Sequence, residues 1–481
     1  MNDSAAGTPN VATEPSPLAP APVSLADAFP TWCRIAALSF GGPAGQIAVM
    51  HRILVEEKKW ISEERFLHAL NYCMLLPGPE AQQLATYVGW LMHRARGGLI
   101  AGTLFILPGF VSIMALSIIY ACFQQTPVVQ ALFFGLKPAV MAVVIEAVLR
   151  IGKRVLKNGT MLAVAALSFI AIFFFQIPFP LVIIAAGLLG YIGGRVAPER
   201  FQVIKGHGPK SSQPSAGGAT SDDSHAAPRI ADVAVVPRPS LRRAATISAL
   251  CLSLWFGPIL AVRLSLGPDS VFYQELIFFS QAAMVTFGGA YSVLAYVAQQ
   301  AVEKFHWLVP GEMLDGLGMA ETTPGPLIIV VEFVGFLGAF RNPGQLDPLT
   351  AGILGAVLTV WVTFVPCFYW IFLGAPYIEM LRGNRLLSAA LSTITAAVVG
   401  VILNLALWFS LHTLFGTVNS VSFAGARFLV PDLGALHPAT SAIALLAMLL
   451  TFRWKRGLAT TLATCALLGI LAYATLPAAW R

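Results

Sequence analysis

Charged residues are scarce in this chain. Only 11% of its 481 residues are Asp, Glu, Lys or Arg, and 57% are hydrophobic. An ordinary soluble domain contains about a quarter charged residues, so most of this chain belongs in lipid. The formal net charge of +7 comes from short basic clusters between apolar runs. Such clusters orient a membrane protein and do not indicate a nucleic-acid-binding surface.

Several signatures of enzymes and motors are also lacking. There is no G-x-x-x-x-G-K-[ST] phosphate loop, no H-E-x-x-H and no G-x-S-x-G, which argues against an enzyme and against ATP-driven transport within this chain. The six cysteines show no C-x-x-C spacing and the histidines are scattered, so we expect no metal site, disulfide framework or cofactor. Residues 1–28 contain no Lys or Arg, which predicts a disordered cytoplasmic tail and not a secretory signal.

Apolar runs recur from residue 31 to the C-terminus. About 20 residues are needed to cross a hydrocarbon core of about 30 Å. The runs predict an all-α polytopic membrane protein with about 13 transmembrane segments. Six precede a polar segment, at 31–50, 66–92, 97–123, 128–149, 160–176 and 178–194, and seven follow it, at 244–266, 271–300, 314–340, 350–375, 386–410, 440–452 and 458–478.

The polar segment divides the chain in two. It contains GHGPKSSQPSAGGATSDDSH, whose Gly, Ser and Pro content argues against a packed fold. We expect this division: a first repeat at 29–195, a cytoplasmic linker at 196–243, an extra connecting span at 244–267 and a second repeat at 268–481.

The two parts repeat one another in sequence. Phe40-Gly41-Gly42 recurs as Phe287-Gly288-Gly289, a shift of 247 positions. The same shift carries Glu56 to Glu303, Trp60 to Trp307, and Pro77-Gly78-Pro79 to Pro324-Gly325-Pro326. Beyond the second motif the shift is 246, pairing Tyr87 with Phe333. Seven crossings separate the starts of the two repeats, which predicts inverted repeats of the kind common in secondary transporters.

The distribution of basic residues predicts the orientation. The linker and the loops with Arg94, Arg96, Arg382 and Arg385 fall on one side, which we assign to the cytoplasm of a bacterial cell. The N-terminus is then cytoplasmic and the C-terminus periplasmic, in a multi-pass protein of the inner membrane. Three features depart from this rule by being basic and external: the stretch 51–65, Arg341 and Arg427.

Gly and Pro interrupt the apolar segments at both Phe-Gly-Gly and both Pro-Gly-Pro motifs. Unpaired backbone groups are costly in lipid, so broken helices survive where they are buried in protein or line a wet cavity. The following half-helix presents free N–H donors, which suit an anion. The alternative is that these residues only allow close packing or a kink. The predicted substrate-binding residues at the breaks are Gly41, Gly42, Pro43, Gln46, Pro77, Gly78, Pro79, Gly288, Gly289, Thr322, Thr323, Pro324, Gly325 and Pro326.

Four ionisable residues in or beside apolar segments are further candidates. Arg34 and Lys137 lie in apolar spans and could attract an anion, although either could instead reach the interface. Glu80 and Glu321 would repel an anion unless protonated, which makes them candidates for proton coupling. Their alternative role is helix capping or an interfacial position.

Glu56 and Trp60, repeated as Glu303 and Trp307, stand four residues apart after each Phe-Gly-Gly segment. This spacing suits a helix along the membrane surface with its Trp as an interfacial anchor. We interpret both pairs as structural first and gating second.

The motifs resemble those of the long-chain chromate ion transporters. The resemblance rests on SFGGPAGQIAVMH (39–51), LLPGPEAQQLA (75–85), GGLIAGTLFILPG (97–109), TFGGAYSVLAYVAQ (286–299) and GLGMAETTPGPLI (316–328). It covers about residues 30–195 and 244–478. The N-terminal extension and the long linker depart from the usual compactness of that family.

The resemblance implies chromate as substrate, the lipid bilayer as environment, export that confers chromate resistance, and two halves of opposite topology. Sulfate, of the same charge and shape, is the alternative substrate. A membrane-embedded enzyme such as a chromate reductase is an alternative of another class. The sequence leaves open whether the protein acts as a monomer or a homodimer.

Overall fold

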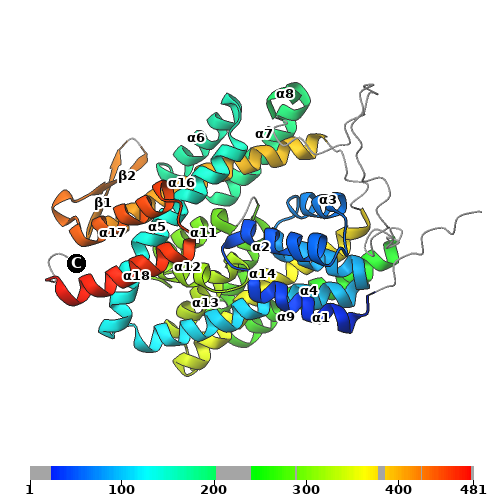
Figure 1. Cartoon of the computed structure of the whole chain (residues 1–481), viewed down its shortest axis with the longest axis horizontal. Coiled ribbons are helices and arrows are strands. Elements are labelled where there is room, and N and C mark those ends of the chain that lie inside the picture. Colours follow the sequence, from blue (N-terminus) through cyan, green and yellow to red (C-terminus); the bar gives the residue numbers. More distant parts are fainter. Residues whose placement is uncertain (1–22, 202–239, 288–289, 378–384, 424, 478–481) are drawn as a thin grey trace, which may run out of the picture.

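Helices dominate the structure (Figure 1), a computed structural model that describes residues 23–201, 240–287, 290–377, 385–423 and 425–477. The first half contains α1 (Leu25–Leu38), α2 (Gly42–His51), the π-helical turn η1 (Arg52–Glu57), α3 (Glu63–Cys73), α4 (Glu80–Phe123), α5 (Pro127–Val155), α6 (Gly159–Phe173), α7 (Phe179–Val196) and α8 (Pro198–Phe201). A connecting helix, α9 (Leu241–Leu266), follows.

The second half has a similar order of elements. It contains α10 (Val271–Met284), α11 (Ala290–Gln299), η2 (Gln300–Lys304), α12 (Glu312–Thr322), η3 (Leu327–Ile329), α13 (Val330–Arg341), α14 (Pro348–Gly374), η4 (Ala375–Tyr377), α16 (Arg385–Leu414), β1 (Val418–Phe423), β2 (Ala426–Pro431), η5 (Leu433–Ala435), α17 (Pro438–Met448), η6 (Leu449–Arg453) and α18 (Leu458–Thr475).

The predicted all-α membrane protein is confirmed in its main features. Seven helices of the described residues are long and apolar enough to cross a membrane, and two shorter apolar helices lie at Gly159–Phe173 and Pro438–Arg453. The exception is β1 and β2, an antiparallel hairpin between α16 and α17 that the apolar runs did not predict.

Helix α4 is in fact two helices. His93 and Arg94 have non-helical backbone angles, and Arg94 has a positive φ of 55°. A Cβ added to Gly89 would lie 2.5 Å from the carbonyl oxygen of Gly97. Eight residues of straight helix would separate these positions by about 12 Å, so the chain reverses here. The two predicted spans that meet at this point are therefore distinct helices, α4a (80–92) and α4b (95–123).

The segments at the second-half motifs double back instead of crossing. Arg341 at the end of α13 lies 2.6 Å from Glu312 at the start of α12, although a straight helix would separate them by about 40 Å. Across the other break, the rings of Phe278 and Tyr296 are 5.3 Å apart. The predictions of single crossings at 271–300 and 314–340 are therefore wrong, because each segment is a hairpin of two short helices.

The first half shows the same folding back. Arg34 on α1 contacts Glu57 at the end of η1 at 2.6 Å, and Tyr72 on α3 lies 5.9 Å, ring to ring, from Tyr87 on α4a. The predicted single crossings at 31–50 and 66–92 are wrong for the same reason. Hydropathy records how apolar a segment is, whereas its direction after a Gly or Pro break leaves no trace in hydropathy.

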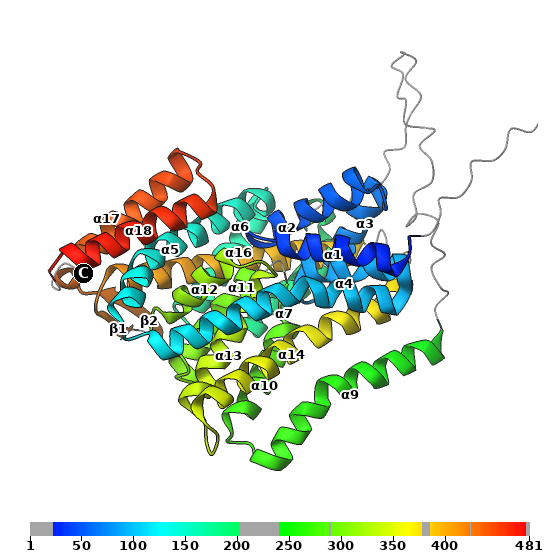
Figure 2. The same ribbon diagram turned by 60° about the horizontal axis from the view of Figure 1, so that its bottom comes forward.

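The two halves interlock through equivalent helices. In the first half α5 packs against α17 and α18, and in the second half its counterpart α16 packs against α6 and α7. Small residues allow close approach: a Cβ on Gly135 of α5 would lie 2.1 Å from the carbonyl oxygen of Cys465 on α18. Figure 2 shows α9 at the margin of the molecule, where Trp361 of α14 donates to the Leu254 carbonyl at 2.7 Å.

Candidate functional site

The first Phe-Gly-Gly motif ends one helix and starts another. Gly41 and Gly42 have φ values of 78° and 75°, which glycine adopts without a steric penalty. Helix α1 stops at Leu38 and α2 starts at Gly42, with Pro43 in its first turn. No side chain of the described residues caps the N-terminus of α2. Its first N–H groups are thus available to an anion.

The two Pro-Gly-Pro motifs also need glycine at their centres. Gly78 and Gly325 have φ values of 126° and 113°. A Cβ on Gly78 would lie 2.8 Å from Cys367 Sγ, and one on Gly325 would lie 3.0 Å from Gly109 Cα. Cys367 and Gly109 each follow a proline inside a long helix of the opposite half, on α14 and α4b. Each motif therefore rests on the other half.

The motifs of the two halves exchange backbone hydrogen bonds. Gly78 N–H donates to the Thr286 carbonyl at 2.8 Å, and Gly325 N–H donates to the Ser39 carbonyl at 2.9 Å. Ser39 and Thr286 directly precede the two Phe-Gly-Gly motifs. The exchange brings the breaks of α1–α2, α3–α4a, α10–α11 and α12–α13 to one junction. Gly288 and Gly289, also predicted here, lie outside the described residues.

Buried glutamines surround this junction. Gln46 on α2 donates to the Gly325 carbonyl at 2.6 Å, and Gln83 on α4a donates to the Pro77 carbonyl at 2.8 Å. Gln82 donates to Thr86 Oγ1 at 3.0 Å. All three are at most 1% exposed, and within the described part of the chain their Oε1 atoms have no partner. The predicted Gln46 thus lies at the junction. Gln83 was not predicted, because nothing in the sequence distinguishes it from its neighbour Gln82.

Polar side chains on the second-half side are engaged locally. Thr322 Oγ1 donates to the Met319 carbonyl at 2.9 Å, and Thr323 Oγ1 donates to the Ala320 carbonyl at 3.4 Å. Glu321 accepts a hydrogen bond from the Tyr291 hydroxyl, which joins α12 to α11 beside the break. Glu80 begins α4a directly after Pro79 and is partly buried.

The two predicted cations lie apart from the junction. Arg34 is half-exposed and pairs with Glu57 at 2.6 Å. Lys137 on α5 lies 3.4 Å from the buried carboxylate of Asp315, near the start of α12, whereas Pro324 follows the other end of that helix. Each cation therefore already has a carboxylate partner in this conformation.

A charged network at the base of the α12–α13 hairpin was not predicted. Glu312 accepts two bonds from Arg341, at 2.6 and 2.7 Å, and one from Val309 N–H at 2.9 Å. Tyr120 of α4b donates to Asp315 at 2.8 Å. The sequence signal was present as acidic residues in an apolar context, but their partners come from three other elements.

The repeated Glu and Trp residues occupy matching turns. In both halves a π-helical turn precedes a non-glycine residue of positive φ, Lys59 at 52° and His306 at 55°. Trp60 and Trp307 follow, and they are 7% and 1% exposed. The interpretation of these tryptophans as interfacial anchors is wrong, because both pack in the protein core. Glu56 pairs with His51 at 3.1 Å.

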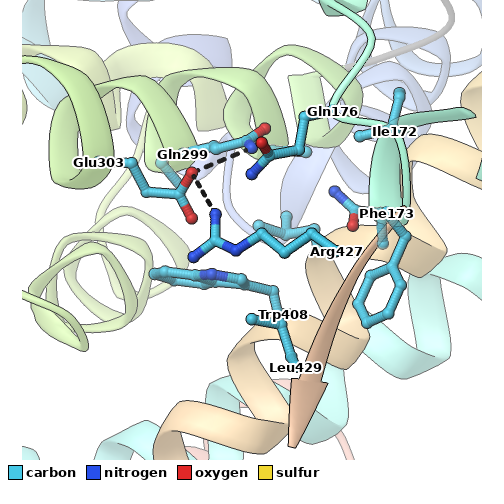
Figure 3. Close-up of a pocket in the computed structure, with 12 residues that line it drawn as sticks. Ile172, Phe173, Gln176, Gln299, Glu303, Trp408, Arg427 and Leu429 are labelled. Atoms are coloured by element: carbon cyan, nitrogen blue, oxygen red, sulfur yellow. Dashed lines mark hydrogen bonds and ion pairs between the residues drawn. The ribbon is translucent and has the colours of Figure 1, made fainter. Parts of the chain in front are cut away.

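A small pocket lies beside the second of these turns (Figure 3). Arg427 of β2 reaches Glu303 at 3.6 Å, and Gln299 donates to the same carboxylate at 3.2 Å. Its lining residues are Ile172, Phe173, Gln176, Ala295, Ala298, Gln299, Glu303, Asn404, Leu405, Trp408, Arg427 and Leu429. The pocket is thus separate from the Phe-Gly-Gly and Pro-Gly-Pro residues.

Broken helix pairs that meet inside a polytopic helical protein are typical of membrane transporters. The family model described as Chromate transporter matches residues 26–191 and 273–470, and this chain belongs to that family. The resemblance seen in the motifs is thereby confirmed.

Relatives of this chain include proteins that match most of its length and shorter proteins that match part of it. A chromate transport protein of Pseudomonas aeruginosa is 31% identical over 390 residues, covering 80% of each chain. One of Cupriavidus metallidurans is 27% identical, covering 77% of this chain and 78% of the relative. An uncharacterized transporter of Bacillus subtilis matches 32% of this chain with 88% of its own length, at 28% identity. No solved structure matches this chain significantly.

Proposed function

We propose that this protein exports chromate from the cytoplasm across the bacterial inner membrane and so confers chromate resistance. The observation that carries the proposal is the junction at which Gly78 and Gly325 exchange hydrogen bonds with Thr286 and Ser39. A site built from two repeats near mid-membrane is the arrangement by which secondary transporters alternate access. Family membership supports chromate as the ion.

The binding chemistry follows from the donors at this junction. The uncapped N-termini of α2 and α4a offer backbone N–H groups and the positive ends of two helix dipoles. The side-chain amides of Gln46 and Gln83 can turn their N–H groups from backbone carbonyls to the ion. The site would hold a dianion largely by hydrogen bonds, with Arg34 or Lys137 released from its carboxylate as the anion passes.

The hairpins also affect which segments of the chain face the cytoplasm. If α1–α2 and α3–α4a enter and leave on the cytoplasmic side, the basic stretch 51–65 is cytoplasmic and obeys the positive-inside rule. Crossings by the long helices α4b, α5 and α7 and by the shorter apolar helix α6 then return the chain to that side before the linker. Helix α9 then carries it across, so the second repeat starts from the periplasmic side. This supports inverted halves, a cytoplasmic N-terminus and a periplasmic C-terminus.

The two external basic residues fit the same orientation. Arg341 and Arg427 would lie on the periplasmic side, and each is paired with a carboxylate, Glu312 and Glu303. A paired arginine adds little net charge to its loop. The domain division at 29–195, 196–243, 244–267 and 268–481 follows from this arrangement.

Energetics favour export over uptake. Moving one negative charge outward across an inside-negative membrane is favourable by about 2.3 kcal/mol per 100 mV, so a dianion gains about 4.6 kcal/mol. Uptake of the same ion would require coupling to a second ion.

Everted membrane vesicles with an inside-positive potential test the proposal. They should accumulate labelled chromate, in chemically unchanged form, above vesicles that lack the protein. Equal signals from the two preparations would contradict transport, and reduced chromium would indicate an enzyme. Excess sulfate should leave most of the chromate flux intact, whereas its abolition together with sulfate accumulation would identify a general oxyanion transporter.

The cationic part of the site has its own test. At least one of Arg34→Ala and Lys137→Ala should lower chromate flux while the protein remains in the membrane. Wild-type flux in both variants would remove these residues from the binding site.

A further inference from the structure

Buried carboxyl groups are distributed unequally between the halves. Among the described residues, every buried carboxyl side chain lies on a second-half hairpin: Glu275, Glu312, Asp315, Glu321 and Glu332. The positions that match them in the first half, by the same shifts of 247 and then 246, hold Ala28, Arg65, His68, Met74 and Thr86. In the first half, the carboxyl group of Glu80, beside the Pro-Gly-Pro motif, is partly buried. Repeated backbone thus carries different chemistry in the two halves.

Three of these five carboxyl groups have hydrogen-bond or ion-pair partners. Glu312 is held by Arg341, Asp315 by Tyr120 and Lys137, and Glu321 by Tyr291. These contacts explain how the three groups are tolerated inside the protein.

The other two carboxyls, Glu275 and Glu332, are 0% exposed. Neither oxygen of either group has a hydrogen-bond partner in the described part of the chain. An isolated ionised carboxylate in an apolar interior is so unfavourable that the group takes up a proton instead. The neutral carboxylic acid is therefore the form that these surroundings favour for both side chains.

The position of Glu332 relates it to the proposed binding junction. It lies in the first turn of α13, six residues after Pro326, or roughly 10 Å along the helix. Its first-half counterpart, Thr86, accepts a hydrogen bond from the junction residue Gln82. Charges at such a separation interact strongly in a low-dielectric interior. A negative Glu332 would repel a bound dianion, and a protonated Glu332 would not.

The titratable groups buried on the elements that pack against α13 either have a hydrogen-bond or ion-pair partner or lie away from the first turn of α13. The buried groups are Glu275 on α10, Glu312, Asp315 and Glu321 on α12, Tyr120 on α4b and Cys367 on α14. Cys367 donates to the Thr363 carbonyl at 3.4 Å. Glu275 contacts the opposite end of the hairpin, where a Cβ on Gly338 would lie 2.7 Å from its Oε1.

We propose that Glu332 is a proton-carrying side chain, and that one proton travels with each chromate ion. This inference rests on the proposed function. In a conformation open to water on one side of the membrane, unlike the closed one described here, Glu332 is a carboxylate and takes up a proton from water as the dianion binds. The carboxylic acid returns that proton to water on the other side when the dianion leaves. The transported unit then carries one net negative charge instead of two.

The voltage dependence of chromate accumulation measures this net charge. In everted vesicles, held in buffer alkaline enough to keep chromate doubly charged, one net charge gives about tenfold accumulation per 60 mV and two give about hundredfold. The wild-type protein should follow the tenfold relation and should acidify the vesicle lumen as chromate enters. Glu332→Gln, a permanent mimic of the neutral acid, should follow the hundredfold relation without acidification.

Two further variants make the test specific. Glu332→Asp keeps a titratable group and should retain the tenfold relation. Glu275→Gln, which alters an equally buried and equally unpartnered carboxyl away from the junction, should also retain it. A tenfold relation in Glu332→Gln, or its loss in Glu275→Gln, would overturn the assignment to Glu332.

The wild-type measurement decides the outcome even if Glu332→Gln is inactive. A hundredfold relation without lumen acidification would overturn proton coupling while leaving chromate export intact. Failure of the wild-type protein to accumulate chromate at all would instead contradict the proposed function.

Discussion

The two halves of this protein share a backbone plan and differ in the charges they bury. Both place glycines of positive φ at the tips of hairpins, and both follow a π-helical turn with a buried Trp. The first half lines its hairpins with the buried amides Gln46, Gln82 and Gln83. The second half buries five carboxyl groups on its hairpins, on α10, α12 and α13. Similar backbone geometry in the two halves thus presents different side-chain chemistry.

The largest expected effect comes from changing the shared backbone plan. Gly78→Ala and Gly325→Ala place a Cβ against Cys367 and Gly109 and force a positive φ on alanine. Each should reduce chromate flux at least about tenfold, since strain of this kind costs about 1–3 kcal/mol and misplaces the junction. The control is Gly257→Ala on α9, where a Cβ meets nothing within 4 Å. Similar flux in all three variants would show that the junction tolerates displacement.

The next effect concerns the buried ion pair at the base of the α12–α13 hairpin. Arg341→Ala leaves Glu312, which is 2% exposed, without its bidentate partner. Loss of one member of a buried pair costs about 3–5 kcal/mol, so the thermal midpoint of the purified protein should fall clearly.

The control for this ion pair is Arg150→Ala, which removes an exposed pair with Glu146 at 3.9 Å. An exposed pair contributes about 0–1 kcal/mol, and little change is expected. Equal midpoints for Arg341→Ala and the wild-type protein would mean that the hairpin base does not depend on this contact.

The sequence predicted part of this comparison. The repeated Gly and Pro residues correctly located the helix breaks, because these residue types act on the local backbone. The hairpins were missed, since an apolar run of about 27 residues has the same hydropathy whether it crosses a bilayer or doubles back. The partners of Arg34, Lys137 and Arg341 were also missed, because each depends on segments 23 to 178 positions away.

A smaller effect should come from the first-half amides. Gln46→Leu removes a side-chain donor at the junction, where the matching second-half residue is the apolar Val293. A hydrogen bond to a charged group contributes about 1.5–3 kcal/mol, so the half-saturating chromate concentration should rise about tenfold or more. Maximal flux should change less, and Gln46→Asn should lose less than Gln46→Leu. An unchanged half-saturating concentration would place the ion away from α2.

The proposed mechanism requires two halves that enter the junction from opposite sides of the membrane. Lys59 and His306 are exposed and occupy matching turns of the two halves. Lys59→Cys and His306→Cys, each placed in a cysteine-free chain that still transports, can be labelled with a membrane-impermeant maleimide in intact cells and in everted vesicles. We expect Lys59→Cys to react only in everted vesicles and His306→Cys only in intact cells. Labelling of both from the same side would contradict the inverted arrangement and, with it, the proposed mechanism.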